Sequence, residues 1–220
     1  MSEPGIRLFR ELKLSSPSGV GALKQALVVS ADRPWIHSIE DEEQLYRAYP
    51  PGITVALFTR EESRGVEPCM LTLLQDLDSL KLTNILPRKI PELGPARYNA
   101  LIKDFLLKVV QPARELVDIK VGIGDEFLSL QTLLGPGAAS ALVAFSNGAN
   151  KATGSSHPLD RKRWFDFILA VDRSPRRPDL EQVLRWLVEA EGWSEETALE
   201  LIRECQFGLE LLQHRVKRTS

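Results

Sequence analysis

Hydrophobic and polar residues follow a strand-like pattern in the first part of the chain. Apolar and charged residues alternate over residues 6–14, which predicts one half-buried β-strand with a bulge near Phe9. The apolar runs 53–59 and 68–74 flank a charged turn, which is typical of a β-hairpin, and residues 80–86 predict a further strand. Together these patterns indicate a small antiparallel sheet in the N-terminal part.

Helical patterns separate and follow these strands. We expect short helices over residues 20–29 and 41–49, with an extended piece at 33–39 between them. Residues 95–117 show a wide apolar face and predict a long helix. Because a proline removes a backbone hydrogen bond and clashes with the preceding turn, we expect this helix to kink or break at Pro112.

The second half of the chain is mainly helical by the same criterion. Residues 127–145 predict a bent helix, and three more helices follow. They begin at Pro158, after Asp179 and after Ser194, where a proline or a capping residue stands at the start of each apolar pattern. Residues 118–124 alternate like a strand but fit a connector equally well.

These elements predict an α+β fold, in which the small antiparallel sheet of the N-terminal part packs with a mainly helical C-terminal part. We expect a single domain, 1–220. The alternative is a subdivision into a mixed α/β portion, 1–92, and a helical portion, 93–220, because prolines punctuate the chain between 91 and 95.

Composition narrows the class of protein without identifying it. Of the 220 residues 43% are hydrophobic, which is enough for a core, and a net charge of −2 gives no general attraction to nucleic acid or membranes. Cys69 and Cys205 lie far apart in apolar patterns, as reduced thiols do in cytosolic proteins. No apolar run reaches the length of a signal peptide or a membrane span. We therefore expect a soluble cytoplasmic protein, of bacterial type from its compactness, with no membrane partner.

The most unusual stretch is the polar run 147–164, which lies between two helical patterns. It brings amides, hydroxyls, an ammonium group, an imidazole and a carboxylate into one short segment. Pro158 fits the first helical position, which makes His157 the N-cap residue and places Asp160 in the first turn. There Asp160 can accept a backbone hydrogen bond and favour the positive end of the helix dipole. The run should therefore form a polar loop at a helix N-terminus.

Such a loop has both a functional and a structural interpretation. Gly148 and Gly154 allow positive φ angles and hence tight turns, and unpaired N–H groups at a helix N-terminus attract anions. We predict that the polar and basic residues of this stretch bind a ligand: Asn147, Asn150, Lys151, Ser155, Ser156, His157, Arg161 and Arg163. In the alternative, the stretch is a helix–loop–helix corner whose polar groups cap the backbone and whose Trp164 packs into the core.

Standard catalytic and metal-binding motifs are missing from the sequence. It contains no phosphate-binding glycine loop, no dinucleotide fingerprint and no nucleophile elbow. The histidines His37, His157 and His214 are scattered instead of being spaced as metal ligands. We therefore predict no metal and no cofactor. The remaining catalytic candidates are His157 as a general base and Asp160 or Asp166 as the carboxylate that orients it.

Basic residues recur near the ends of the C-terminal helices. If the last helices pack antiparallel, these residues form one surface that could grip a phosphate backbone or an acidic protein. They are Arg161, Lys162, Arg163, Arg173, Arg176, Arg177, Arg215, Lys217 and Arg218.

Three functions follow from these patterns. The first is an interaction or regulatory protein that binds a protein partner and has no chemistry of its own, which the missing catalytic motifs favour. The second is a binder of nucleic acid or of a phosphate-bearing ligand through the 147–164 loop and nearby basic residues. The third is a phosphodiesterase-like or transferase enzyme that uses His157. A homo-oligomer is compatible with each of them.

Overall fold

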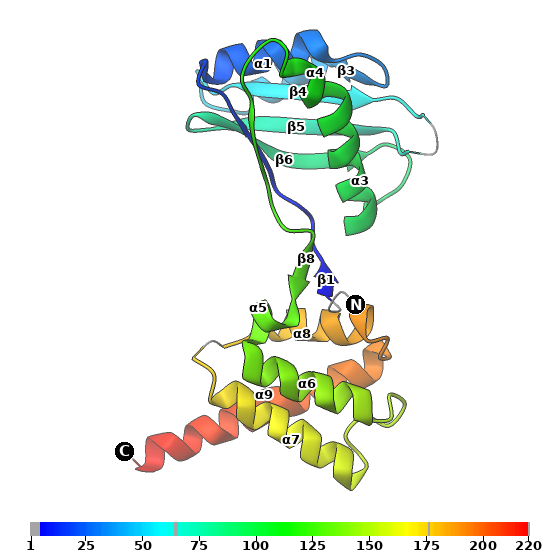
Figure 1. Ribbon diagram of the computed structural model, residues 1–220, viewed down its shortest axis with the longest axis vertical. Helices are drawn as coiled ribbons and strands as arrows, with labels where there is room; N and C mark the ends of the chain where they lie inside the picture. Colours follow the sequence, from blue (N-terminus) through cyan, green and yellow to red (C-terminus); the bar gives the residue numbers. More distant parts are fainter. Residues whose placement is uncertain (1–4, 64–65, 176, 220) are drawn as a thin grey trace. The chain divides into compact units, whose positions relative to one another are not determined.

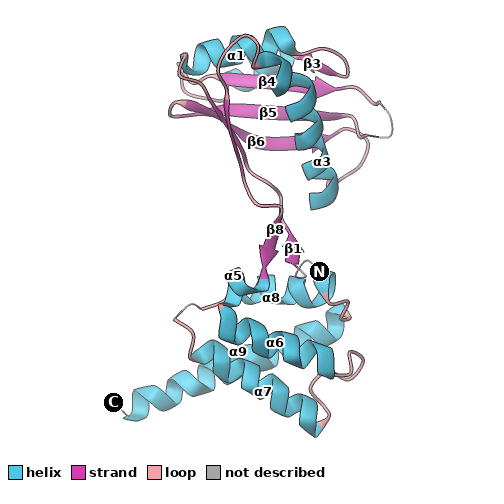
Figure 2. Ribbon diagram, in the orientation of Figure 1, coloured by secondary structure: helices cyan, strands magenta, loops and turns pink. Residues whose placement is uncertain are grey.

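The chain folds into two compact units. The computed structural model describes residues 5–63, 66–175 and 177–219. One unit is formed by Leu8–Glu126 and is called the sheet unit below; the other, the helical unit, contains the chain before Leu8 and from Phe127 onward. The predicted α+β class is confirmed, since antiparallel sheets and helices are both present (Figures 1 and 2). The division considered between residues 92 and 93 lies inside the sheet unit.

The sheet unit is organised around a six-stranded antiparallel sheet in the order β3-β4-β5-β6-β2-β7 (Figure 2). The strands are β2 (Leu12–Ser15), β3 (Trp35–His37), β4 (Val55–Arg60), β5 (Cys69–Asp76), β6 (Ser79–Pro87) and β7 (Lys120–Ile123). The predicted hairpin is confirmed, because Val55 pairs with Leu74 at one end of β4–β5 and Arg60 pairs with Cys69 at the other. The sheet is larger than expected, since residues 120–123 add an edge strand.

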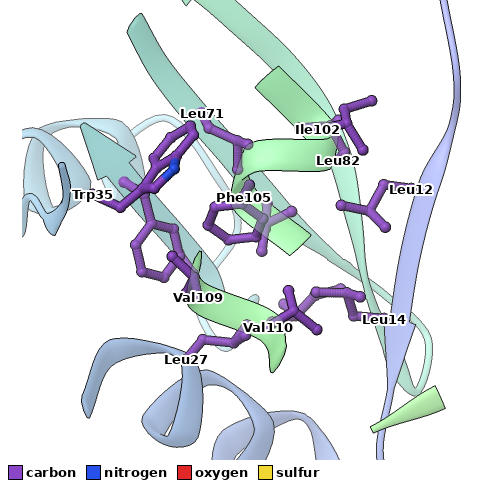
Figure 3. Close-up of a cluster of buried hydrophobic side chains, with 14 of the residues drawn as sticks. Leu12, Leu14, Leu27, Trp35, Leu71, Leu82, Ile102, Phe105, Val109 and Val110 are labelled. Atoms are coloured by element: carbon purple, nitrogen blue, oxygen red, sulfur yellow. The ribbon is translucent and has the colours of Figure 1, made fainter. Parts of the chain in front are cut away.

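Helical segments cover one face of this sheet: α1 (Gly19–Ser30), α3 (Pro95–Phe105), the π-helical segment η1 (Leu106–Val110) and α4 (Gln111–Ala113). Helix α2 (Ile39–Tyr46) follows β3 and contributes no residue to that core; it lines a hollow with Leu57 and Met70, which belong to the opposite face of the strands. Apolar residues of α1, α3 and η1 form one core with the inward-facing residues of the strands. In Figure 3, Phe105 of α3 lies among buried side chains from the strands and from α1. Its ring packs edge-on against Trp35, with centroids 5.1 Å apart, and against Phe58 at 5.2 Å.

The turn of the long helix before Pro112 is wider than an α-helical turn. The Gln111 N–H bonds the Leu106 carbonyl, which is a π-helical step, and the helix runs through the proline to end at Ala113. Because a proline ring presses on the carbonyl one turn back, a wider turn makes room for it. The predicted disturbance is therefore present as a π-helical segment, while the predicted continuation over 113–117 is a turn.

Two of the predicted elements were wrong. Residues 6–14 form two strands in different sheets, β1 (Gly5–Arg7) and β2, because the backbone between them is bonded elsewhere. Asn99, which is 1% exposed, donates to the Leu8 carbonyl at 2.8 Å and accepts from the Arg10 N–H at 3.0 Å. Residues 127–129 were expected to be helical but form β8 (Phe127–Ser129), which pairs antiparallel with β1.

The helical unit contains the β1–β8 pair and a set of packed helices (Figure 1). The helices are α5 (Leu130–Leu134), α6 (Pro136–Gly148), α7 (Pro158–Asp172), α8 (Leu180–Arg185), the π-helical segment η2 (Trp186–Ala190) and α9 (Glu195–Thr219). Their core is rich in aromatic residues. Phe145 stacks on Trp193 with centroids 5.3 Å apart and packs against Trp164, which is fully buried as predicted.

Both cysteines are buried and free, as expected from their apolar surroundings. Burial raises the pKa of Cys69 and of Cys205 to about 12. Both thiols therefore stay protonated at neutral pH and are poor nucleophiles.

Candidate functional site

The 147–164 stretch forms the corner between α6 and α7. Helix α7 begins with the predicted cap: Pro158 is its first residue, and His157 accepts a hydrogen bond through Nδ1 from the Leu159 N–H at 3.3 Å. At the other side of the corner, α6 ends at Gly148. Gly154 has the expected positive φ of 58°, whereas Gly148 does not. A Cβ at Gly148 would lie 2.9 Å from the Arg163 guanidinium, so a larger residue there would require this flexible side chain to shift.

Asp160 holds the two ends of the corner together. It is 6% exposed, and its Oδ1 atom accepts a hydrogen bond from Arg163 Nη1 at 2.8 Å. Its Oδ2 atom accepts from the Asn150 N–H at 3.4 Å. Arg163 also reaches the Gly148 carbonyl at 3.4 Å. Asp160 and Arg163 therefore act as a clamp between the end of α6 and the first turn of α7.

Lys151 ties the loop to the segment after η2. Its Nζ atom donates to the Glu191 carbonyl and lies 3.6 Å from the Glu191 carboxylate. That carboxylate also accepts a hydrogen bond from the buried Ser146 hydroxyl at 2.7 Å, and Trp193 Nε1 donates to the same hydroxyl at 2.8 Å. These contacts connect Lys151 to the aromatic core. The ammonium group of Lys151 therefore stabilises the packing of the helical unit.

The other polar residues of the loop are also bonded within the protein. Ser155, which is buried, donates to Glu204 of α9 at 2.7 Å. Ser156 donates to the Thr153 carbonyl, and the Asn150 side chain accepts from the Ala152 N–H at 3.0 Å. Contacts of this kind stabilise turns and helix starts. Among the predicted ligand-binding residues, Asn147, Asn150, Ser156, His157 and Arg161 are exposed, and Ser155 is buried.

The catalytic candidates His157 and Asp160 make their described contacts with other groups. His157 accepts a hydrogen bond from the Leu159 N–H, and Asp160 accepts one from Arg163. A general base must reach the proton it removes, and an orienting carboxylate must reach the base. The described contacts are instead those of a capped corner. Ligand binding or catalysis by these residues stays a prediction.

A small hollow lies beside the corner. It has a volume of about 110 Å³, and its walls include Ser155, Ser156 and Arg161 together with Glu200 and Glu204 of α9. Pockets for ordinary ligands measure roughly 300–1,000 Å³. The two carboxylates also oppose the entry of a phosphate or carboxylate next to Arg161. The hollow is therefore a poor site for a phosphate-bearing ligand.

A larger, apolar groove opens between α7 and α9. It has a volume of about 480 Å³ and is lined by Arg161, Phe165, Ile168, Leu169, Glu204, Phe207, Gly208, Leu211 and Leu212. Phe165, Phe207 and Leu211 are 52%, 68% and 61% exposed. Arg161 and Glu204 line both the groove and the small hollow, so the two are continuous at the corner end. Exposed apolar side chains thus gather on one side of the helical unit.

Helix packing explains why the groove is present. Gly208 faces α7, and a Cβ at this position would lie 3.1 Å from the Ile168 side chain, so the small residue lets the two helices approach. Phe207 and Leu211, four positions apart on one side of α9, are exposed. The core side of α9 runs through Leu201, Cys205, Leu209 and Leu212. Two large apolar residues outside that side of the helix were the available signal, and sequence reasoning passed over them.

The proposed basic surface is only partly described. Arg163 is paired with Asp160, and Arg161 and Lys162 are exposed in the first turns of α7. Arg176 and the side chains of Arg215, Lys217 and Arg218 lie outside the described residues. A continuous basic surface stays a prediction.

Polar side chains buried in the sheet unit are paired with one another. Arg60, 2% exposed, donates through Nε to Asp104 Oδ2 at 2.9 Å, and Trp35 Nε1 donates to the same oxygen at 2.9 Å. A second cluster joins Glu42 to Lys24 and to His37 Nε2, the latter at 2.7 Å. Both clusters attach a helix to the strands.

Searches for a metal site, a membrane-spanning helix and a related protein give no further indication of the function. Within the described ranges, no group of three or more His, Cys, Asp or Glu side chains is placed to hold a metal ion. None of the described helices combines the length and the apolar character needed to cross a membrane. No protein-family model, no curated protein and no solved structure gives a significant match to the chain.

Proposed function

We propose that the protein acts by binding a protein partner through the groove between α7 and α9, and that it performs no chemistry of its own. The observation that carries this proposal is the grouping of Phe165, Phe207 and Leu211, all more than half exposed, along one groove. Exposed apolar patches of this kind mark interaction surfaces.

The form of the groove suits a helical segment of the partner. Two helices form its walls, and the apolar residues Phe207 and Leu211 stand four positions apart on one of them. This is the arrangement that accepts the apolar face of an amphipathic helix. Burying one large apolar side chain contributes about 1.5–3 kcal/mol, so a few such contacts supply a useful affinity.

The state of the 147–164 loop also supports a binding protein over the two alternatives. Lys151 and Ser155 are bonded to other parts of the helical unit, and Asp160 and Arg163 are bonded to each other. A phosphate binder or a hydrolase needs such groups directed at a ligand. We place the interaction in the bacterial cytoplasm, and the two free, buried thiols support a reducing compartment.

Site-specific cross-linking tests this proposal. A photoreactive phenylalanine analogue replaces Phe207 in the full chain, and the same analogue at Leu77, 84% exposed in the sheet unit, serves as the control. We expect a discrete protein adduct from position 207 in the cells of origin, and its loss when Phe165→Asp is added. An adduct pattern at position 207 no different from that at position 77 would overturn the proposal.

A further inference from the structure

The sheet unit contains a hollow between α2 and the strands β4, β5 and β6. It lies on the face of the strands opposite the buried core and has a volume of about 580 Å³. Sites for small molecules measure roughly 300–1,000 Å³. We infer that this hollow binds an uncharged heteroaromatic amine of nucleoside size. The inference is independent of the proposed function, because the hollow and the groove lie in different units.

The floor of the hollow is apolar. Leu57 of β4 and Met70 of β5 form part of it, and the next residues along these strands, Phe58 and Leu71, belong to the core on the other face. Leu45 of α2 continues the apolar surface. A flat ring that lies on this floor removes apolar surface from water on both sides of the contact.

Thr72 of β5 adds a hydroxyl group to the floor. The residue is 6% exposed and lines the hollow. Its hydroxyl makes no hydrogen bond with any of the described residues. Because a buried polar group without a partner costs free energy, this hydroxyl is a favourable place for a bond to a ligand.

A β-bulge directs two adjacent polar residues of β6 to the same face. The register between β5 and β6 shifts after Thr72, which leaves Thr83 as an extra residue in β6. Leu82 and Ile85 flank the bulge and both belong to the core. Thr83 and Asn84 lie between them and both line the hollow, whereas neighbours in a regular strand face opposite sides. Bulges are frequent beside functional sites because they redirect side chains in this way.

Asp41 of α2 determines the charge of the hollow. Among the described residues that line it, Asp41 alone is ionised at neutral pH. Its Oδ2 atom accepts a hydrogen bond from Ser38 Oγ at 2.7 Å and lies 3.8 Å from Arg88 Nη2. Its Oδ1 atom makes no hydrogen bond with the described part of the chain, so it can accept one from a ligand. A carboxylate opposes a phosphate group and favours an amino group.

These groups match the edge of a nucleobase. The amides of Gln44 and Asn84 stand on the two sides of the hollow, and Asp41 adds a carboxylate. A side-chain amide donates and accepts in one plane, as Asn and Gln do with adenine, and a carboxylate accepts from the amino group of cytosine. An amino-bearing nucleoside without phosphate therefore fits the hollow in size, charge and hydrogen bonding.

Titration calorimetry on the full chain tests this inference, with adenosine and cytidine as the probes. Inosine and uridine carry a carbonyl in place of the amino group, and the 5′-monophosphates add negative charge. We expect adenosine or cytidine to bind with a Kd below about 1 mM. The corresponding keto nucleoside and monophosphate should bind at least about tenfold more weakly, because both oppose the Asp41 carboxylate.

Two variants connect the binding to the hollow. Asp41→Asn removes the charge but keeps the shape, and it should weaken binding of the probe about tenfold and reduce the discrimination against the monophosphate. Thr72→Val replaces the hydroxyl by a methyl group and should weaken binding about fivefold. Glu43→Gln on α2 and Thr59→Val on β4 are the controls, since neither residue lines the hollow, and both should bind as the natural chain does. Circular dichroism confirms that each variant is folded.

The possible results separate clearly. If neither adenosine nor cytidine binds at about 1 mM, the inference is wrong. Equal binding of the keto nucleosides or of the monophosphates would overturn the role of Asp41 and with it the class of ligand. Binding that persists in both Asp41→Asn and Thr72→Val would show that the probe occupies another site. None of these results affects the cross-linking test at Phe207, which concerns the helical unit.

Discussion

The two units of the protein expose their apolar side chains in different ways. In the sheet unit such residues belong to separate elements, for example Val29 in α1 and Leu77 in the turn between β5 and β6. In the helical unit Phe165, Phe207 and Leu211 line one groove. Single exposed apolar residues are normal in globular proteins, whereas grouped ones are typical of an interface. The difference supports the proposal that the helical unit is the part that binds a partner.

The units resemble each other in the treatment of buried polar groups. Arg60 and Asp104 pair in the sheet unit, and Asp160 and Arg163 pair in the helical unit. A polar group taken out of water costs free energy unless it is bonded. Substitutions in the paired clusters should therefore lower stability, and substitutions in the groove should lower association without affecting stability.

The largest loss of stability is expected from Arg60→Ala. Arg60 bonds Asp104 and also donates to the carbonyls of Glu61 and Val66, so its removal leaves several acceptors without a donor. Breaking a buried ion pair from one side typically costs 3–5 kcal/mol, and we expect about 3 kcal/mol here. Urea unfolding followed by circular dichroism measures the change.

Arg33→Ala is the matched control for this substitution. Arg33 lies 3.6 Å from the Glu61 carboxylate, but its side chain is 79% exposed. An exposed ion pair contributes little, so we expect a change below about 0.5 kcal/mol. Equal losses for the two arginines would show that burial of Arg60 has no energetic role, and the contrast between paired cluster and open surface would fail.

A smaller loss is expected from Asp160→Ala, which opens the α6–α7 corner. Asp160 accepts hydrogen bonds from Arg163 and from the Asn150 backbone, and the expected cost is about 1.5 kcal/mol. The exposed Asp166, on the same helix, is the control, and Asp166→Ala should change stability by less than about 0.5 kcal/mol. A variant at Asp160 that keeps its stability but loses an activity of the protein would restore the catalytic interpretation of the corner.

Local signals in the sequence were sufficient for the elements that are fixed locally. The start of α7 followed from Pro158 and His157, and the β4–β5 hairpin followed from two apolar runs around a charged turn. In both cases the residues that determine the structure are neighbours in the chain. The polar loop of 147–164 was located for the same reason, since its composition is local information.

The sequence could not reveal features that depend on distant partners. β8 has only three residues, which is too short to show a periodic pattern, and its partner β1 lies near the N-terminus. Asn99 separates β1 from β2 through bonds to Leu8 and Arg10, which no pattern indicates. Likewise, the partners of Lys151 and Ser155 lie just after η2 and on α9. Whether a polar group faces a ligand or another part of the fold depends on such contacts.

A pH-dependent loss is expected from Glu42→Gln in the sheet unit. Burial raises the pKa of Glu42, but hydrogen bonds from Lys24, His37 and the Leu57 N–H outweigh it, so the pKa lies below its ordinary value of 4.5. The charged form therefore stabilises the fold above about pH 4.5, and this contribution disappears as the pH falls through the lowered pKa. We expect Glu42→Gln to cost about 1 kcal/mol near neutral pH and less in acid.

Stability curves at several pH values measure this difference, and Glu43→Gln is the control because Glu43 is exposed on the same helix. The difference between the natural chain and Glu42→Gln should shrink on acidification, while Glu43→Gln should match the natural chain throughout. A constant difference at every pH would mean that packing, and not the charge of Glu42, attaches α2 to the strands.

The smallest change in stability and the largest change in association are expected from Phe207→Asp. Because this side chain is 68% exposed, the free energy of unfolding should change by less than about 0.5 kcal/mol. Loss of a central aromatic contact typically weakens binding by 2 kcal/mol or more, which is about thirtyfold. Sedimentation of the variant and of Leu77→Asp, equally charged but in the sheet unit, each with the partner captured at position 207, compares the two surfaces directly. If both substitutions leave association unchanged, the grouping of apolar residues in the helical unit has no functional meaning. If only Phe207→Asp weakens association, the groove is the interface.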